Sequence, residues 1–306
     1  MTSPFAIKGV FAAALTPLDP DYAFVPDDLL SLLGFLAQRG CHGALLLGTT
    51  GEGPSFSPPE RLQIMRTAIS IRQTHPEFKL LVGTGTPSLD ETIGLTRAAF
   101  EIGMDAVVVL PPYYYRQVPD EGLFAWYSQL MRSAVPSGNL LLGYHIPAVS
   151  GIPLSLDLLA RLKDAFPQRF AGVKDSSGDL ENARRLGDLF GSDMIVLSGN
   201  DRLFSYALAH SAAGCITALA NLCSLDLRVI WDAHQRGESL EMVQERLNTA
   251  RSIIDRYPPA PPLLKYLISR MYEFPRWPVR PPLQPLKEEN EEQVFLDAVA
   301  GMEAGV

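Results

Sequence analysis

The sequence contains little cysteine. Only three of its 306 residues are cysteines (Cys41, Cys215 and Cys223), and no two of them form a Cys-x-x-Cys pair. An odd number of scattered cysteines argues against a disulfide framework and is typical of reduced, packed thiols. We therefore predict a protein of a reducing compartment, with the cytoplasm as its expected location.

Positive charge and long hydrophobic runs are also scarce. The chain has 26 Lys and Arg against 34 Asp and Glu, a formal net charge of -8. A main partner that is nucleic acid or an anionic membrane would favour a basic surface, so neither is expected. No run approaches the ~18 apolar residues of a membrane span. Residues 1–10 (MTSPFAIKGV) lack the charged-then-apolar form of a signal peptide.

Apolar residues, by contrast, are plentiful, at 47% of the chain. Short apolar runs alternate with longer segments of helical spacing, and runs that are apolar on both faces predict a parallel sheet covered by helices. Eight such units predict an α/β protein with a closed (β/α)8 TIM barrel. An open doubly wound sheet competes, but its usual Gly-x-Gly-x-x-Gly turn is absent after the first strand. The predicted strands cover residues 10–17, 43–49, 79–85, 105–112, 140–147, 170–176, 194–200 and 214–221.

The chain also predicts helices beyond the eighth strand. A barrel helix over 58–73 opens with Ser57 as its cap and prolines in its first turn. Amphipathic helices are expected over 240–257 and 262–274, a proline-rich connector over 275–286, and a short last helix over 291–300. We predict a catalytic barrel over 1–223, and the last barrel helix plus a C-terminal helical extension over 224–306.

A lysine stands in an unusual place. Lys174 directly follows the apolar residues of the sixth predicted strand, and barrels gather their chemistry at such strand ends. Burial disfavours the ammonium form and lowers the pKa, which leaves an amine that can form an imine with a ketone. The imine acts as an electron sink and needs a proton shuttle nearby. The Tyr144 hydroxyl, near the end of the adjacent strand, suits that task.

The second predicted strand ends in GTTGEG, residues 48–53. Thr49 and Thr50 are placed to relay the proton, while the amides of the turn cradle a carboxylate. An oxo acid would use both features. Each motif also has a structural interpretation: a tight turn for GTTGEG, which is no P-loop, and an ion pair of Lys174 with Asp175 or Glu52. Their convergence on one barrel mouth favours a site.

Six short motifs occur in a fixed order across nearly the whole chain. They are GTTGE (48–52), PPYY (111–114), GYHIP (143–147), GVK (172–174), SGND (198–201) and GCITALAN (214–221). In this ordered set the chain resembles the dihydrodipicolinate synthase / N-acetylneuraminate lyase family of pyruvate-dependent Schiff-base enzymes.

The resemblance implies roles for particular residues. Lys174 would form the Schiff base with pyruvate, and Tyr144 would transfer the protons. Thr49 and Thr50 would bind the pyruvate carboxylate. Tyr114 would reach across a dimer interface and complete a Tyr–Thr–Tyr relay with Thr49 and Tyr144.

The resemblance also implies the partners and the assembly. The substrates would be pyruvate and an aldehyde, the oligomer a homotetramer built as a dimer of dimers, and no metal or organic cofactor would be needed. Within the matching motifs, further substrate contacts are expected from Gly48, Gly51, Gly199 and Ile216.

Two positions depart from the family pattern. Val149 stands where dihydrodipicolinate synthases usually carry an arginine that holds the semialdehyde carboxylate, and a valine cannot pair with a carboxylate unless Arg116 or another group compensates. Arg202 stands where sialic acid lyases typically have an acidic residue. We therefore predict an aldolase for a 2-keto-3-deoxy sugar acid or another hydroxy-oxo acid. His145 is interpreted as a group that supports its neighbours rather than as a catalyst.

Three alternatives remain open on the sequence. One is a true 4-hydroxy-tetrahydrodipicolinate synthase of lysine biosynthesis. Another is an oxo-acid-binding protein that kept the fold and lost turnover. The third is a metal-dependent barrel lyase or isomerase, for which the sequence supplies only His145 as a plausible ligand at a strand end.

Overall fold

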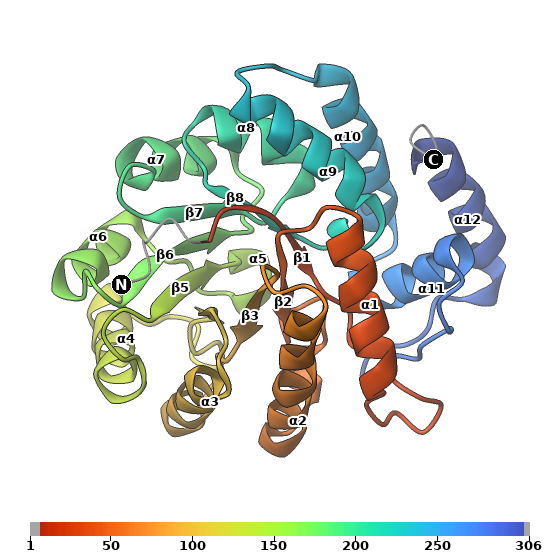
Figure 1. Cartoon of the computed structure of the whole chain (residues 1–306). Coiled ribbons are helices and arrows are strands. Elements are labelled where there is room, and N and C mark those ends of the chain that lie inside the picture. Colours follow the sequence, from red (N-terminus) through yellow and green to blue (C-terminus); the bar gives the residue numbers. More distant parts are fainter. Residues whose placement is uncertain (1–6, 303–306) are drawn as a thin grey trace. The chain divides into compact units, whose positions relative to one another are not determined.

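The fold is a parallel barrel of eight strands. The computed structural model describes residues 7–302. Residues 1–6, which belong to the segment where no signal peptide is predicted, lie outside the described residues. The strands follow one another in order around the closed barrel (Figure 1). The predicted TIM barrel is therefore confirmed. The strands are β1 (Gly9–Ala13), β2 (Gly43–Leu46), β3 (Lys79–Gly83), β4 (Ala106–Val109), β5 (Leu140–His145), β6 (Phe170–Asp175), β7 (Ile195–Ser198) and β8 (Gly214–Thr217).

Each strand is shorter than the apolar run that predicts it, chiefly at the carboxyl end. β2 ends at Leu46 because Leu47 takes the left-handed conformation, with a φ of 54°, which an extended strand cannot contain. The run 214–221 divides between β8 and the start of α9 (Ala220–Gln235). Several motif residues therefore lie beyond the strand ends, such as Gly48–Glu52 after β2, whereas Lys174 and Tyr144 stay within β6 and β5.

By its internal contacts the described chain divides into two compact units. The first comprises residues 7–9 and 79–216, and its buried strands pair in parallel from β3 to β8. Its helical segments are α3 (Leu89–Ile102), α4 (Asp120–Ala134), α5 (Pro147–Ser150), α6 (Leu156–Ala165), α7 (Leu180–Phe190), η4 (Asp201–Leu203) and α8 (Phe204–Ala209).

The second unit comprises residues 10–78 and 217–302, and its strands β1 and β2 pair in parallel with Phe11 opposite Gly43. The predicted cap is confirmed, because the backbone N–H of Ser57 donates to Glu60 Oε2 at 2.8 Å. Its helical segments are α1 (Pro26–Gln38), η2 (Gly53–Ser55), α2 (Pro58–Ala68), η3 (Ile69–Gln73), α9, α10 (Glu241–Arg256), α11 (Ala260–Tyr272) and α12 (Glu288–Met302).

The C-terminal extension of this unit follows the prediction closely. α10 and α11 are helices, residues 275–286 form an irregular connector, and α10, α11 and α12 lie together in the blue part of Figure 1. The last helix is longer than predicted and begins at Glu288. Glutamates crowd its first turn, where negative charge is stabilised by the helix dipole.

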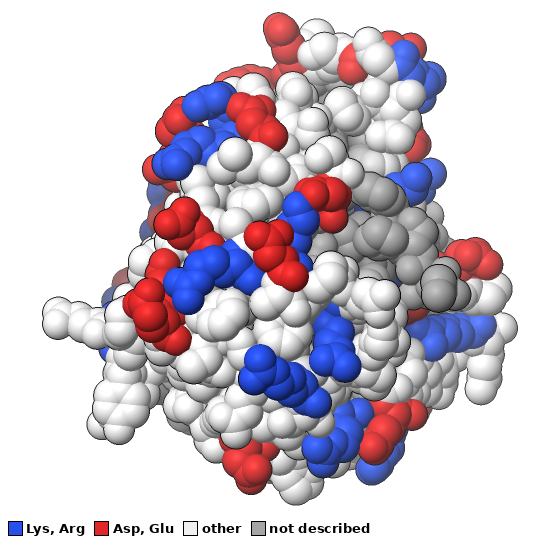
Figure 2. Space-filling model, turned by 90° about the vertical axis from the view of Figure 1, so that its left-hand side faces the viewer, with Lys and Arg blue, Asp and Glu red and all other residues white. Residues whose placement is uncertain are grey.

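The surface carries both charge signs. On the face shown in Figure 2, basic and acidic side chains are interspersed. Along α7, for example, Arg184 pairs with Glu181 and Asp188. None of the helices between residues 7 and 302 is long and apolar enough to cross a membrane.

The three cysteines are buried, as predicted, and form no disulfide within residues 7–302. Burial raises the pKa of the Cys41 thiol to about 12. Because the thiolate is the reactive form, Cys41 is an inert packing residue rather than a nucleophile.

Candidate active site

The first unit brings together the two residues at the centre of the predicted chemistry. Lys174 lies in β6 and is only 3% exposed. In the β5–β6 ladder its register partner is Tyr144, which is also buried. The Nζ atom of Lys174 lies 4.2 Å from the centroid of the Tyr144 ring. The pairing of β5 with β6 therefore holds the Lys174 amine over the ring face of Tyr144, the residue whose hydroxyl is predicted to transfer protons.

An ion pair of Lys174 is the structural interpretation of this residue. Within residues 7–302 the Lys174 Nζ has no carboxylate or hydrogen-bond partner, so that interpretation is wrong. Of the two carboxylates considered, Asp175 Oδ1 accepts from the Ser177 N–H at 3.0 Å, and Glu52 Oε1 lies 2.6 Å from Lys265 Nζ. The Lys174 amine is therefore not committed to a structural ion pair.

His145, the last residue of β5, is buried beside the same strand ends. Its Nδ1 accepts from the Leu154 N–H at 2.9 Å, so the proton of the neutral ring sits on Nε2, 3.9 Å from Asp175 Oδ1. Burial lowers the pKa of His145, and the negative charge of Asp175 partly opposes that shift. This geometry suits a residue that ties the β5–α6 loop to its strand.

The pKa shift of His145 predicts a pH-dependent stability. Because the folded-state pKa lies below the unfolded value of about 6.5, the unfolded chain takes up the proton first as the pH falls. The contribution of His145 to the free energy of unfolding is complete above about pH 6.5 and is lost as the pH falls from there through the folded-state pKa of His145. We expect His145→Asn, measured by urea unfolding across this range, to flatten that decline. An unchanged pH dependence in the variant would contradict the assignment.

In the second unit the GTTGEG motif forms a compact turn after β2. The Gly53 N–H donates to the Gly48 carbonyl at 3.1 Å, and the Glu52 N–H donates to the Thr49 carbonyl at 3.2 Å. Thr49 is exposed, whereas Thr50 is only 6% exposed. The turn therefore presents one threonine outward and buries the next.

Close packing explains the glycines of this turn. A Cβ on Gly51 would lie 2.8 Å from the Ala14 carbonyl oxygen, and the Gly51 carbonyl accepts from Thr16 Oγ1 at 2.7 Å. A Cβ on Gly48 would lie 3.2 Å from the side chain of Leu45. Of the two, Gly51 is the position where a larger residue would force the turn to shift.

The loop after β4 carries the exposed tyrosines. Tyr114 is 75% exposed, and its ring stands edge-on to that of Tyr115, with the centroids 5.2 Å apart. The next residue, Arg116, lies against the β5–α6 loop: its Cδ is 2.8 Å from where a Cβ of Gly151 would be. Val149, in the short helix α5 that precedes Gly151, is 55% exposed.

The remaining predicted contacts lie at β7 and β8. Gly199 directly follows β7, and a Cβ there would lie 1.9 Å from Ser176 Oγ, so the loops after β6 and β7 are in close contact. Ile216 is fully buried within β8. Arg202, in η4, is exposed, and its backbone N–H donates to Asn200 Oδ1 at 3.0 Å.

The burial of Lys265 in α11 was not predicted from the sequence. An amphipathic helix predicts a lysine on its outer face, yet this one is 1% exposed; its apolar neighbours Leu263, Leu264, Leu267 and Ile268 were the available signal. Burial lowers the pKa of Lys265, and Glu52 opposes the shift. Its Nζ contacts Glu52 Oε1 and the Pro278 carbonyl oxygen, each at 2.6 Å. This second buried amine is therefore occupied, unlike Lys174.

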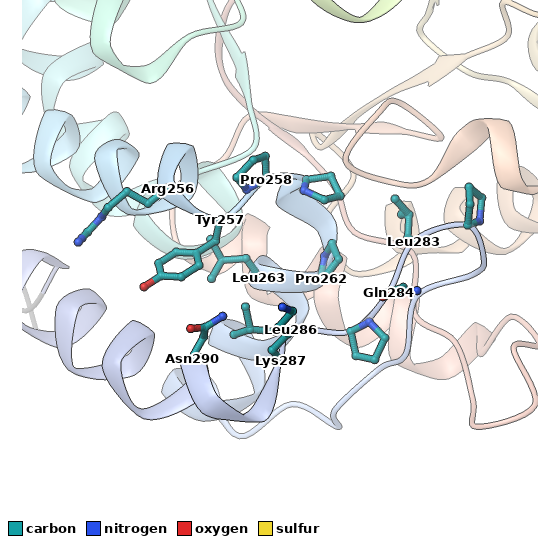
Figure 3. A pocket seen from close by; sticks show the side chains of 13 residues that line it. Arg256, Tyr257, Pro258, Pro262, Leu263, Leu283, Gln284, Leu286, Lys287 and Asn290 are labelled. Atoms are coloured by element: carbon teal, nitrogen blue, oxygen red, sulfur yellow. The ribbon is translucent and has the colours of Figure 1, made fainter.

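A hollow of about 440 Å³ lies elsewhere in the second unit, between the end of α10, the start of α11 and the connector (Figure 3). Prolines and leucines form most of its wall, and the polar positions are Arg256, Tyr257, Gln284, Lys287 and Asn290. Lys287 is largely exposed. None of the residues that the sequence singles out for catalysis lines this hollow.

Metal chemistry would require a cluster of ligands. Between residues 7 and 302, no three His, Cys, Asp or Glu side chains come together as a candidate metal site. The alternative of a metal-dependent barrel enzyme therefore lacks its ligand set in the described part of the chain.

Comparison with known proteins places the chain among close relatives. A sequence model described as the dihydrodipicolinate synthetase family matches residues 6–299. An uncharacterized DapA-like lyase of Chloroflexus aurantiacus is 37% identical over 284 residues, 92% of this chain and 93% of the relative. A 4-hydroxy-tetrahydrodipicolinate synthase of Rhodospirillum centenum is 32% identical over 256 residues, 82% and 84% of the two chains. The crystal structure of a dihydrodipicolinate synthase of Acinetobacter baumannii complexed with pyruvate has a TM-score of 0.88 at 26% identity, covering 97% of this chain and 99% of that one.

Proposed function

This chain belongs to the dihydrodipicolinate synthetase family, and we propose that it is a lyase that condenses pyruvate with an aldehyde, or releases it, through a Schiff base on Lys174. One observation carries the proposal. The buried Nζ of Lys174 lies 4.2 Å from the Tyr144 ring centroid and has no ion-pair partner within residues 7–302. The pyruvate complex of the Acinetobacter baumannii relative supports the choice of oxo acid.

The chemistry follows from that arrangement. The Lys174 amine attacks C2 of pyruvate, and the resulting carbinolamine loses water to give a protonated imine. Loss of a proton from C3 gives an enamine, whose C3 forms the new bond to the aldehyde carbon, and hydrolysis returns the lysine. The Tyr144 hydroxyl transfers the protons of these steps. Cleavage is the same sequence in reverse.

The GTTGEG turn is assigned to the pyruvate carboxylate. Thr49 and Thr50 donate hydroxyl hydrogen bonds, and the backbone of Gly48 and Gly51 completes the turn around the anion. Backbone N–H groups of a tight turn bind anions well because their dipoles converge. Further contacts to the substrate are assigned to Gly199 and Ile216.

We assign the assembly as a homotetramer built as a dimer of dimers. Tyr114 would then contribute its hydroxyl to the site of a neighbouring copy and join Thr49 and Tyr144 in a proton relay. The support is its exposure: Tyr114 and Tyr115, side by side, are 75% and 73% exposed. A pair of large exposed aromatic side chains is characteristic of a surface that contacts another protein.

Reductive trapping tests the proposed function. Borohydride added to the protein with pyruvate should leave one covalent group per chain, on the peptide that contains Lys174, because reduction converts the imine into a stable secondary amine. Mass spectrometry of the intact protein and its peptides reads the result. Without pyruvate the mass should not change. Absence of any adduct would favour the alternative of a non-catalytic protein.

A second part of the proposal concerns which aldehyde the enzyme accepts. Val149 provides no cation for a carboxylate, and a charge-assisted hydrogen bond is worth about 1.5–3 kcal/mol. We therefore expect kcat/KM for aspartate semialdehyde to be about 10–100-fold below that of the preferred acceptor. A panel with glyceraldehyde, glyoxylate and N-acetylmannosamine measures this selectivity. The exposed Arg202 favours an acceptor with an anionic far end, so N-acetylmannosamine should also be used poorly.

The same panel tests the main alternative. The Rhodospirillum centenum relative favours a 4-hydroxy-tetrahydrodipicolinate synthase, and Arg116, which lies against Gly151, is the cation available to replace the missing arginine. The alternative would be established if kcat/KM for aspartate semialdehyde exceeded that of the other aldehydes by more than tenfold and if Arg116→Gln removed that difference.

A further inference from the structure

A buried ion pair joins the GTTGEG turn to the C-terminal extension. Glu52 Oε1 lies 2.6 Å from Lys265 Nζ, and the two side chains are 0% and 1% exposed. The ammonium also donates to the Pro278 carbonyl at 2.6 Å. All three residues belong to the second unit. Charges this deeply buried must stay paired, because neither can be hydrated where it lies.

The other carboxylate oxygen is held from the connector. The Arg280 N–H donates to Glu52 Oε2 at 2.9 Å. The guanidinium of Arg280 in turn donates to the Ser55 carbonyl at 3.0 Å and to Glu60 Oε1 at 2.6 Å. The arginine hydrogen bond lowers the pKa of Glu60 to about 2. Helix α11 and the connector thus enclose the carboxylate of Glu52 within the GTTGEG turn.

The backbone of the turn depends on such support. Leu47 and Glu52 both adopt the left-handed conformation, each with a φ of 54°, which costs energy for residues other than glycine. They stand on either side of Gly48–Gly51. A Cβ on Gly53 would lie 2.0 Å from the Leu47 carbonyl oxygen, so the two ends of the turn are packed together. Surrounding contacts must maintain this strained geometry.

We propose that Glu52 is a positioning residue, and that Lys265 and Arg280 hold its carboxylate so that Gly48–Gly51 keeps the shape that binds the carboxylate of the oxo acid. The inference rests on the proposed function, because it takes the turn as the anion site. The C-terminal extension then contributes to substrate binding, because its Lys265 supplies the cation that holds the turn. Moving the turn would require separation of a buried ion pair.

Lys265→Met is the first test. Methionine keeps the length of the side chain but leaves the Glu52 carboxylate buried without its cation, so the turn must move to hydrate it. We expect KM for pyruvate to rise roughly tenfold or more, with a smaller change in kcat. In the double variant Glu52→Gln/Lys265→Met no charge remains to be hydrated, and the amide still accepts from the Arg280 N–H. Its KM should return to within about threefold of wild type.

A matched control separates positioning from stability. Arg246 and Asp226 form a second ion pair of the same unit, at 2.7 Å between α10 and α9; it is only partly buried and does not touch the turn. Arg246→Gln should lower the unfolding temperature and leave KM for pyruvate unchanged, because KM is a property of the folded molecules. Unfolding temperatures are measured for every variant beside KM and kcat.

The outcomes are distinct. A KM in Lys265→Met equal to that in Arg246→Gln, or no recovery in the double variant, would overturn the positioning role while the wild-type pyruvate adduct still forms. A wild type that forms no adduct would instead remove the proposed function. If Lys265→Met does not fold, Lys265→Arg takes its place: its larger head group displaces Glu52, and it too should raise KM relative to Arg246→Gln.

Discussion

In the trapping experiment, Lys174→Ala should lose both the pyruvate adduct and turnover. Alanine cannot form an imine, so no covalent path to the enamine remains. Removal of a catalytic nucleophile costs about 10⁶-fold in kcat in the best-studied enzymes, and we expect a loss of that order. Intact-protein mass and pyruvate release or consumption are measured together. The far-ultraviolet circular dichroism spectrum should stay that of wild type, because alanine fits the buried strand.

Lys174→Arg distinguishes a nucleophile from a fixed charge. Arginine would supply a fixed positive charge beside Tyr144, but it stays protonated and forms no imine, so activity and adduct should be lost as completely as with alanine. The other lysines of interest are internal controls. Lys163 pairs with Asp193, and Lys265 is held by Glu52. An adduct on either peptide, or an active Lys174→Arg variant, would contradict the assignment.

The fold could be predicted because it depends on a pattern that is local in sequence. Strands buried on both faces require short apolar runs, and each run is followed by a helix, so the order of elements in the barrel is visible without the structure. The strand ends could not be predicted. Whether Leu47 continues the strand or turns away depends on the packing of Gly53 against it, and apolarity carries no information about that.

The residues of the candidate site likewise divide into those that could be predicted from the sequence and those that could not. Lys174 and Tyr144 were identified because a lysine at the end of an apolar strand is conspicuous, and the β5–β6 register then sets them side by side. The Glu52–Lys265 pair was missed because its members lie on elements distant in sequence. Helical spacing treats Lys265 as a surface residue, and only tertiary packing shows that α11 buries it with a carboxylate.

Tyr144→Phe should slow turnover severely while the protein stays folded and still binds pyruvate. The substitution removes only the hydroxyl and keeps the ring, so the 4.2 Å contact between that ring and Lys174 Nζ can persist. Water must then carry out the proton transfers of imine formation and the proton transfer at C3 of pyruvate. Loss of a positioned acid/base costs roughly 10²–10⁴-fold in rate. Steady-state kcat and the time course of adduct formation should fall together.

A second buried tyrosine of the same unit provides the control for this effect. Tyr127 is fully buried in α4, and its hydroxyl donates to the Val109 carbonyl at 2.9 Å. Tyr127→Phe leaves that acceptor unpaired and should cost about 1–3 kcal/mol of stability with little change in kcat. If both variants lost activity in proportion to their loss of stability, the Tyr144 hydroxyl would be a structural group. A kcat near that of wild type in Tyr144→Phe would mean that another group moves the protons.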